Sequence, residues 1–133
     1  MNITVGYIPT AEGVAAVDYA IEQAKLLQSS LTVVNTGKDG NYADAVFATD
    51  EDMDALDAQL AAAGIDHKIV RPTDGAPAAA SILAVAEQHG ADLIVIGIRR
   101  RSPVGKLITG STAQAILLDA DCPVVAVKGK HPA

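Results

Sequence analysis

The stretch ADLIVIGIRRRSPVGKLITGST, residues 91–112, determines how the rest of the chain is interpreted. It opens with the apolar run 93–96, which lacks the polar alternation of a half-exposed strand. Such a run suits a strand buried on both faces, as in a parallel sheet covered by helices. Ile94 and Ile96 are expected to face one helical layer and Val95 the other. Gly97 is expected to end this strand.

The segment that follows Gly97 is basic, although the chain as a whole is acidic. Arg99, Arg100, Arg101 and Lys106 are four of the ten basic residues in a chain of net charge −6. The triplet Gly110-Ser111-Thr112 is expected to open a helix, whose unpaired N–H groups and partial positive charge favour a phosphate. An anion site is therefore predicted here. The alternatives are a solvated basic loop that pairs with acids of a dimer mate, and a simple helix cap.

Composition favours a single α/β domain over residues 1–133, long enough to bury a core. Half of the residues are hydrophobic, but only three Tyr and one Phe are aromatic and none is Trp. The core must therefore consist of Ala, Val, Ile and Leu, which suits helices packed closely on a sheet. The net charge of −6 disfavours wholesale nucleic-acid binding, which needs a basic face.

Location and redox state are also predicted from the sequence. No apolar run approaches the roughly 20 residues that cross a bilayer. The first strand begins at Ile3 without a charged and then apolar leader, so no secretory signal is expected. Cys122 is the only cysteine, which excludes an intrachain disulfide. We therefore expect a cytoplasmic protein with no membrane or nucleic-acid partner.

Strands and helices are predicted to alternate along the chain. Apolar runs predict strands over 3–7, 31–35, 67–71, 93–96 and 123–128. Helical spacing predicts helices over 11–27, 50–63, 75–89 and 112–118, with 36–49 as a loop. Thr10 is expected to cap the first helix, Gly64 to end the second and Gly90 to end the third. This alternation predicts a parallel sheet with helices on both faces and a ligand site at the carboxyl ends of the strands.

The chain resembles the universal stress protein family in ADLIVIG at 91–97, in the spacing from Gly97 to Gly110-Ser111, and in DCPVVAVK at 121–128. The segment GAPAAASILAVAEQHGAD, at 75–92, is similar to the family's segment before the fourth strand. The resemblance covers nearly the whole chain. It implies a three-layer α/β sandwich like that of adenine nucleotide alpha-hydrolases, with a five-stranded parallel sheet in the order 3-2-1-4-5. It also implies a homodimer formed through the last strand.

Many members of this family bind ATP through a glycine, two residues, a second glycine, nine residues, and then Gly-Ser or Gly-Thr. Gly97, Gly110 and Ser111 match this motif, but Arg100 stands at the second glycine and allows close backbone approach less readily. Ile8-Pro9-Thr10 stands where the family commonly has Asp-Gly-Ser, so Ile8 offers the nucleobase only apolar contact. The resemblance thus implies a degenerate site for ATP or another adenine nucleotide. The residues expected to form it are Ile8, Pro9, Thr10, Val34, Gly97, Arg99, Arg100, Gly105, Gly110, Ser111 and Thr112.

Other kinds of site are disfavoured by spacing. A calcium loop that starts at Asp50 would need Gly and Glu where Ala55 and Ala61 stand. Gly105-Lys106 is followed by Leu107, so it is no Walker A motif. No nucleophile–base pair, paired carboxylates or metal set can be assembled, and we expect no enzyme.

Two functions remain open. The first is a stress-response module that binds ATP or a related nucleotide. The second is a dimeric adaptor of the same fold that has lost nucleotide binding and works through protein partners. The glycines at 97 and 110 favour the first, while Arg100 and Ile8 favour the second.

Overall fold

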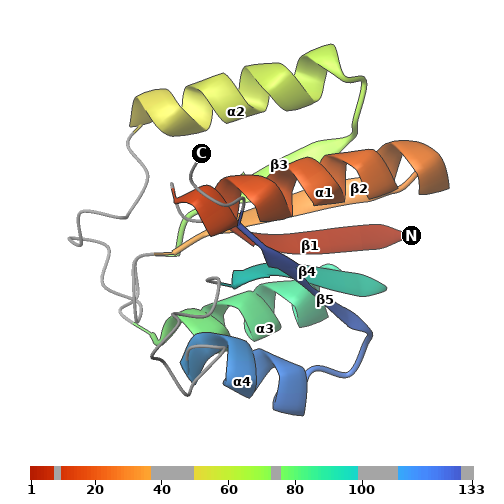
Figure 1. The fold of residues 1–133 in the computed structure, drawn as a ribbon. Helices are drawn as coiled ribbons and strands as arrows, with labels where there is room; N and C mark the ends of the chain where they lie inside the picture. The colour runs from red at the N-terminus through yellow and green to blue at the C-terminus, as the bar shows by residue number, and fades with distance from the viewer. Residues whose placement is uncertain (8–9, 37–49, 73–75, 99–110, 130–133) are drawn as a thin grey trace.

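The computed structural model describes residues 1–7, 10–36, 50–72, 76–98 and 111–129, which form a three-layer α/β sandwich (Figure 1). The elements in chain order are β1 (Asn2–Tyr7), α1 (Ala11–Leu27), β2 (Ser30–Asn35), α2 (Asp50–Ala62), β3 (His67–Val70), α3 (Ala78–Gln88), β4 (Leu93–Ile98), α4 (Ser111–Asp119) and β5 (Val124–Lys128). All neighbouring strands are parallel, and their order is β3-β2-β1-β4-β5. The predicted fold class and strand order are confirmed.

Two apolar layers hold the helices on the sheet. α1 and α2 cover one face, and α3 and α4 cover the other (Figure 1). Successive strand residues point to opposite faces, so β4 contributes to both layers. Val95 packs on the α1 side, whereas Ile94 and Ile96 pack on the α3 side, as predicted from the run 93–96.

α1 begins and ends through local hydrogen bonds. The Thr10 hydroxyl accepts a hydrogen bond from the Gly13 N–H at 3.1 Å, which confirms Thr10 as the cap. The buried side of the helix is a stripe of small and medium side chains: Gly13, Ala16, Val17, Ala20, Ile21 and Ala24. Val14 and Leu27 share the helical spacing, but they lie at the margin of this stripe and remain about half exposed.

Several predicted boundaries are wrong by a few residues. β4 does not end at Gly97 but continues to Ile98, because both residues still pair with β5. α3 begins at Ala78, after Pro77 at the N-cap position. His89, the last residue of the predicted range 75–89, is the half-buried C-cap of the helix. The predicted loop at 36–49 lies outside the described residues except for Thr36.

α2 agrees more closely with its predicted range, 50–63. Met53, Leu56 and Leu60 are its buried residues, and Gly64 follows with a φ of +73°. A positive φ favours glycine, so the predicted helix stop is confirmed. Within the described ranges, no helix is long and apolar enough to cross a membrane.

Candidate functional site

The carboxyl edge of the sheet is where the predicted site residues gather. All five strands are parallel, so their carboxyl ends and the N-termini of the helices that follow them lie at one edge (Figure 1). α1 reaches this edge on one face of the sheet and α4 reaches it on the other. Helix N-termini carry partial positive charge, so this edge favours an anion from both faces.

The first turn of α1 lies directly on the end of β4. A Cβ added to Gly97 would collide with the backbone carbonyl of Glu12, and one added to Gly129 would lie 3.0 Å from the Glu12 nitrogen. Only residues without a side chain allow this close approach. Gly97 therefore has a packing role, because it seats the positively polarised end of α1 beside the central strands.

The structure assigns different parts to the predicted residues that it describes. Thr10 caps α1, and Gly97 holds the same turn against β4. Ser111 begins α4 and Thr112 is half-buried in its first turn. Val34 is fully buried among side chains of the α3 layer, so its side chain belongs to the core.

The remaining predicted site residues cannot be placed. Ile8, Pro9, Arg99, Arg100, Gly105 and Gly110 lie outside the described residues. The basic loop and the second half of the glycine motif therefore stay predictions from the sequence.

A series of linked hydrogen bonds at the carboxyl edge of the sheet was not predicted from the sequence. The buried Asn35 amide at the end of β2 donates a hydrogen bond to the Tyr7 carbonyl at 3.1 Å. Its carbonyl oxygen accepts one from the Arg71 Nε at 3.2 Å, and Arg71 also pairs with Asp50 at 2.6 Å. These contacts tie the ends of β1, β2 and β3 to the start of α2. The sequence signal was an Asn at the end of an apolar strand, which is more often a turn residue.

Tyr7 and Cys122, each near the end of a strand, both have raised pKa values. Burial and then the Asp52 carboxylate raise the pKa of the Tyr7 phenol, which stays neutral at physiological pH. Burial, followed by Asp121 and Asp92, raises the pKa of the Cys122 thiol. A protonated thiol is a poor nucleophile, and Cys122 packs against the apolar layer on the α3 side of the sheet.

The described residues form no metal-ion cluster, and some of them line a hollow at the opposite edge of the sheet. Among the described residues, no three His, Cys, Asp or Glu side chains are grouped so that they could hold a metal ion. An open hollow of about 430 Å³ lies between the end of α1 and the turn that precedes β3. It belongs to the amino edge of the sheet, opposite to the predicted nucleotide site.

Known proteins resemble this chain over nearly its full length. The sequence profile of the universal stress protein family matches residues 1–128. A universal stress protein of Mycolicibacterium smegmatis is 41% identical over 126 residues, which cover 95% of this chain and 96% of that protein.

Solved structures extend the likeness to three dimensions. The structure of a universal stress protein from Archaeoglobus fulgidus has a TM-score of 0.77 and 30% identity, with 96% of this chain and 98% of that chain covered. A universal stress protein structure from the same organism, in complex with dAMP, has a TM-score of 0.63 and 24% identity, with 96% and 98% covered.

Proposed function

Because this chain belongs to the universal stress protein family, we propose that it binds an adenine nucleotide at the carboxyl edge of its sheet. The observation that carries the proposal is the packing of Gly97, the first glycine of the family's nucleotide motif, against the first turn of α1. This contact brings one helix N-terminus to the end of β4, and α4 begins at the same edge on the other face. The protein then acts as a small stress-response module.

Ligands of related proteins support an adenine nucleotide. One Archaeoglobus fulgidus universal stress protein structure carries dAMP. Further structures of the same fold carry AMP, in an Arabidopsis thaliana family protein, and cAMP. These relatives share the fold with this chain, and the proposed ligand class follows from them.

The phosphates and the base of the nucleotide are each assigned to residues whose charge or polarity suits them. The phosphates bind the N–H groups of Gly110, Ser111 and Thr112, and Arg99 or Arg100 adds charge-assisted contacts. Ile8 stands where the family's aspartate would contact the base, so the base is held by apolar contact and weakly selected. Val34 contributes through the strand end, since its side chain is buried.

We further propose a binding function without catalysis, in a homodimer that pairs β5 across a twofold axis. The second candidate is an adaptor that has lost nucleotide binding and acts through protein partners. Arg100 and Ile8 favour it, because both replace residues that the family uses for the nucleotide.

Calorimetric titration with ATP, AMP and inorganic phosphate at two salt concentrations tests the site. We expect Arg99→Ala and Arg100→Ala each to weaken binding by about 1.5–3 kcal/mol, roughly tenfold or more, and higher salt to weaken it further. Lys25→Ala is the matched control, because it removes one positive charge from the amino edge of the sheet. The double change Ile8→Asp and Arg100→Gly should improve ATP binding over AMP and phosphate.

Two outcomes would contradict parts of this proposal. Tight and selective ATP binding by the unchanged protein would show that Ile8 and Arg100 do not weaken the site. If neither the unchanged protein nor the double variant bound any phosphate, the basic loop would be a partner surface, and the adaptor function would replace nucleotide binding.

A further inference from the structure

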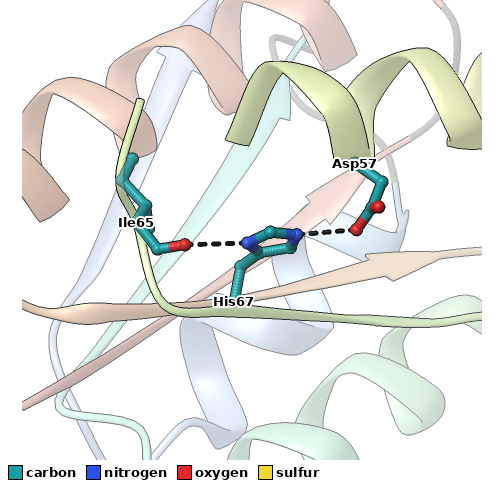
Figure 2. A network of polar contacts seen from close by, with 3 residues as sticks. All are labelled: Asp57, Ile65 and His67. Carbon is teal, nitrogen blue, oxygen red and sulfur yellow. Dashed lines mark hydrogen bonds and ion pairs between the residues drawn. The ribbon is translucent and has the colours of Figure 1, made fainter. Parts of the chain in front are cut away.

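His67, the first residue of the edge strand β3, connects three segments of the chain. Figure 2 shows its imidazole between the Ile65 carbonyl, in the turn before β3, and the Asp57 carboxylate on α2. The Nδ1 atom is 2.8 Å from the Ile65 oxygen, and the Nε2 atom is 2.7 Å from Asp57 Oδ1. The imidazole is largely buried, with 13% of the side chain exposed, whereas Asp57 is 64% exposed.

Both contacts together require a protonated ring. A carbonyl oxygen and a carboxylate oxygen only accept hydrogen bonds, so each ring nitrogen must donate. A neutral imidazole has one N–H and would place a lone pair against one of these oxygens. The imidazolium has two N–H groups and is the only form that satisfies both contacts.

The hydrogen bonds and charges around His67 also favour the protonated ring, because they raise its pKa. The hydrogen bond to Ile65 is the largest cause that raises the pKa of His67, followed by the hydrogen bond to Asp57, with the charges of Asp57 and Asp66 adding to it. Partial burial opposes this shift. On the neighbouring strand β2, His67 pairs with the uncharged Leu31, and Lys68 belongs to the other face of the sheet.

Among the contacts described for α2, three buried side chains and two ion pairs attach it to the rest of the molecule. Its buried residues are Met53, Leu56 and Leu60, and the described ion pairs that hold it are Asp50–Arg71 at its start and Asp57–His67 in its middle. An arginine stays charged at any physiological pH, whereas a histidine changes charge near neutrality. Of these two ion pairs, Asp57–His67 is therefore sensitive to pH and Asp50–Arg71 is not.

We propose that the His67–Asp57 ion pair is a pH switch. It attaches α2 to β3 when His67 is protonated, and the attachment is lost when His67 loses its proton. The pKa of His67 is raised in the folded state, so the stabilisation is complete below the ordinary histidine value of about 6.5. It is lost as the pH rises through the higher folded value. α2 should consequently open more easily at mildly alkaline pH than at mildly acidic pH.

The protonation state is tested first, by NMR titration of the histidine ring signals in the full chain. We expect the pKa of His67 to lie above about 6.5, and Asp57→Asn to lower it while the Ile65 contact keeps part of the shift. A pKa at or below the ordinary value in the unchanged protein would overturn the proposal.

The effect on α2 is tested by double-mutant cycles for both ion pairs at pH 5.5 and pH 8.5. Amide hydrogen exchange of α2, corrected for intrinsic rates, reports the opening equilibrium of the helix. The variants are His67→Gln, Asp57→Asn and their combination, and the matched control cycle uses Arg71→Gln and Asp50→Asn.

We expect the His67–Asp57 coupling to change the opening constant about threefold at pH 5.5 and to vanish at pH 8.5. The Arg71–Asp50 coupling should be equal at both pH values. A His67–Asp57 coupling that is absent at pH 5.5, or equal at the two pH values, would refute the proposed pH switch. If His67→Gln does not fold, Asp57→Asn alone tests the proposal, because the Asp57 side chain is exposed and its replacement should not prevent folding. The effect of Asp57→Asn on the opening of α2 must then disappear at pH 8.5.

Discussion

At the scale of single residues, two glycines permit contacts between the sheet and a helix. A Cβ at Gly97 would collide with the Glu12 backbone, which is fixed within the first turn of α1. A Cβ at Gly6 would lie 2.8 Å from the end of the Ile82 side chain, which can change its rotamer. The two positions therefore differ in what must move to accept a methyl group.

We expect Gly97→Ala to lower the free energy of unfolding by about 1–3 kcal/mol, because a helix backbone must shift to make room. Gly6→Ala is the matched control and should cost less, since only a flexible side chain must adjust. Urea denaturation of both variants measures the difference. Equal losses would show that α1 is not held as closely to β4 as the structure indicates.

At the scale of secondary-structure elements, α2 combines a narrow apolar face with polar attachments to the carboxyl edge. Asn35 is central to them, because its amide joins the Tyr7 carbonyl to the guanidinium of Arg71, which in turn contacts Asp50. Asn35 is fully buried, and its removal leaves the part-buried Tyr7 carbonyl and Arg71 Nε–H without these partners. Unpaired buried polar groups cost more than the net gain of a hydrogen bond.

Asn35→Ala should therefore lower the free energy of unfolding by about 1–3 kcal/mol. The loss should be the same at pH 5.5 and pH 8.5, because neither an amide nor a guanidinium titrates in this range. Gln59→Ala removes an exposed amide from α2 and should leave the denaturation midpoint unchanged. A loss that depends on pH would mean that Asn35 acts through a titrating neighbour.

At the scale of the whole molecule, the strand order places β5 at one edge of the sheet and β3 at the other. The Ile94 N–H donates to the Pro123 carbonyl, and the Gly129 N–H donates to the Ile98 carbonyl. Strand alternation then directs the N–H of Val125 toward β4 and that of Ala126 toward the open edge. Among the described strands none pairs with this outer edge of β5, and such an edge favours pairing with a second copy.

Proline substitutions at Val125 and Ala126 distinguish the loss of the proposed dimer from the loss of the monomer fold. Ala126→Pro should yield a folded monomer, because it removes an N–H only from the outer edge. Val125→Pro breaks the contact between β4 and β5 and should destabilise the monomer itself. Light scattering and circular dichroism check the two results, and a monomeric unchanged protein at micromolar concentration would refute the dimer.

Local patterns in the sequence were sufficient for much of the architecture. The apolar run 93–96 predicted a strand buried on both faces and the alternation of its side chains, which the two apolar layers confirm. Thr10 as a cap and Gly64 as a helix stop were also predicted, because both depend on hydrogen bonds or backbone angles within a few residues. The strand order required the family resemblance, since periodicity does not say which strands pair.

Contacts between distant segments were decided only by the tertiary structure. Gly97 was predicted to end its strand, whereas it continues β4 and seats α1, a role that depends on where the Glu12 backbone lies. Asn35 and Arg71 are 36 positions apart, and only the pairing of β2 with β3 brings them together. His67 likewise meets Asp57 only after α2 has packed on the sheet. Periodicity and capping arise from neighbours along the chain, but register and helix docking arise from the packing of the whole molecule, which no local pattern encodes.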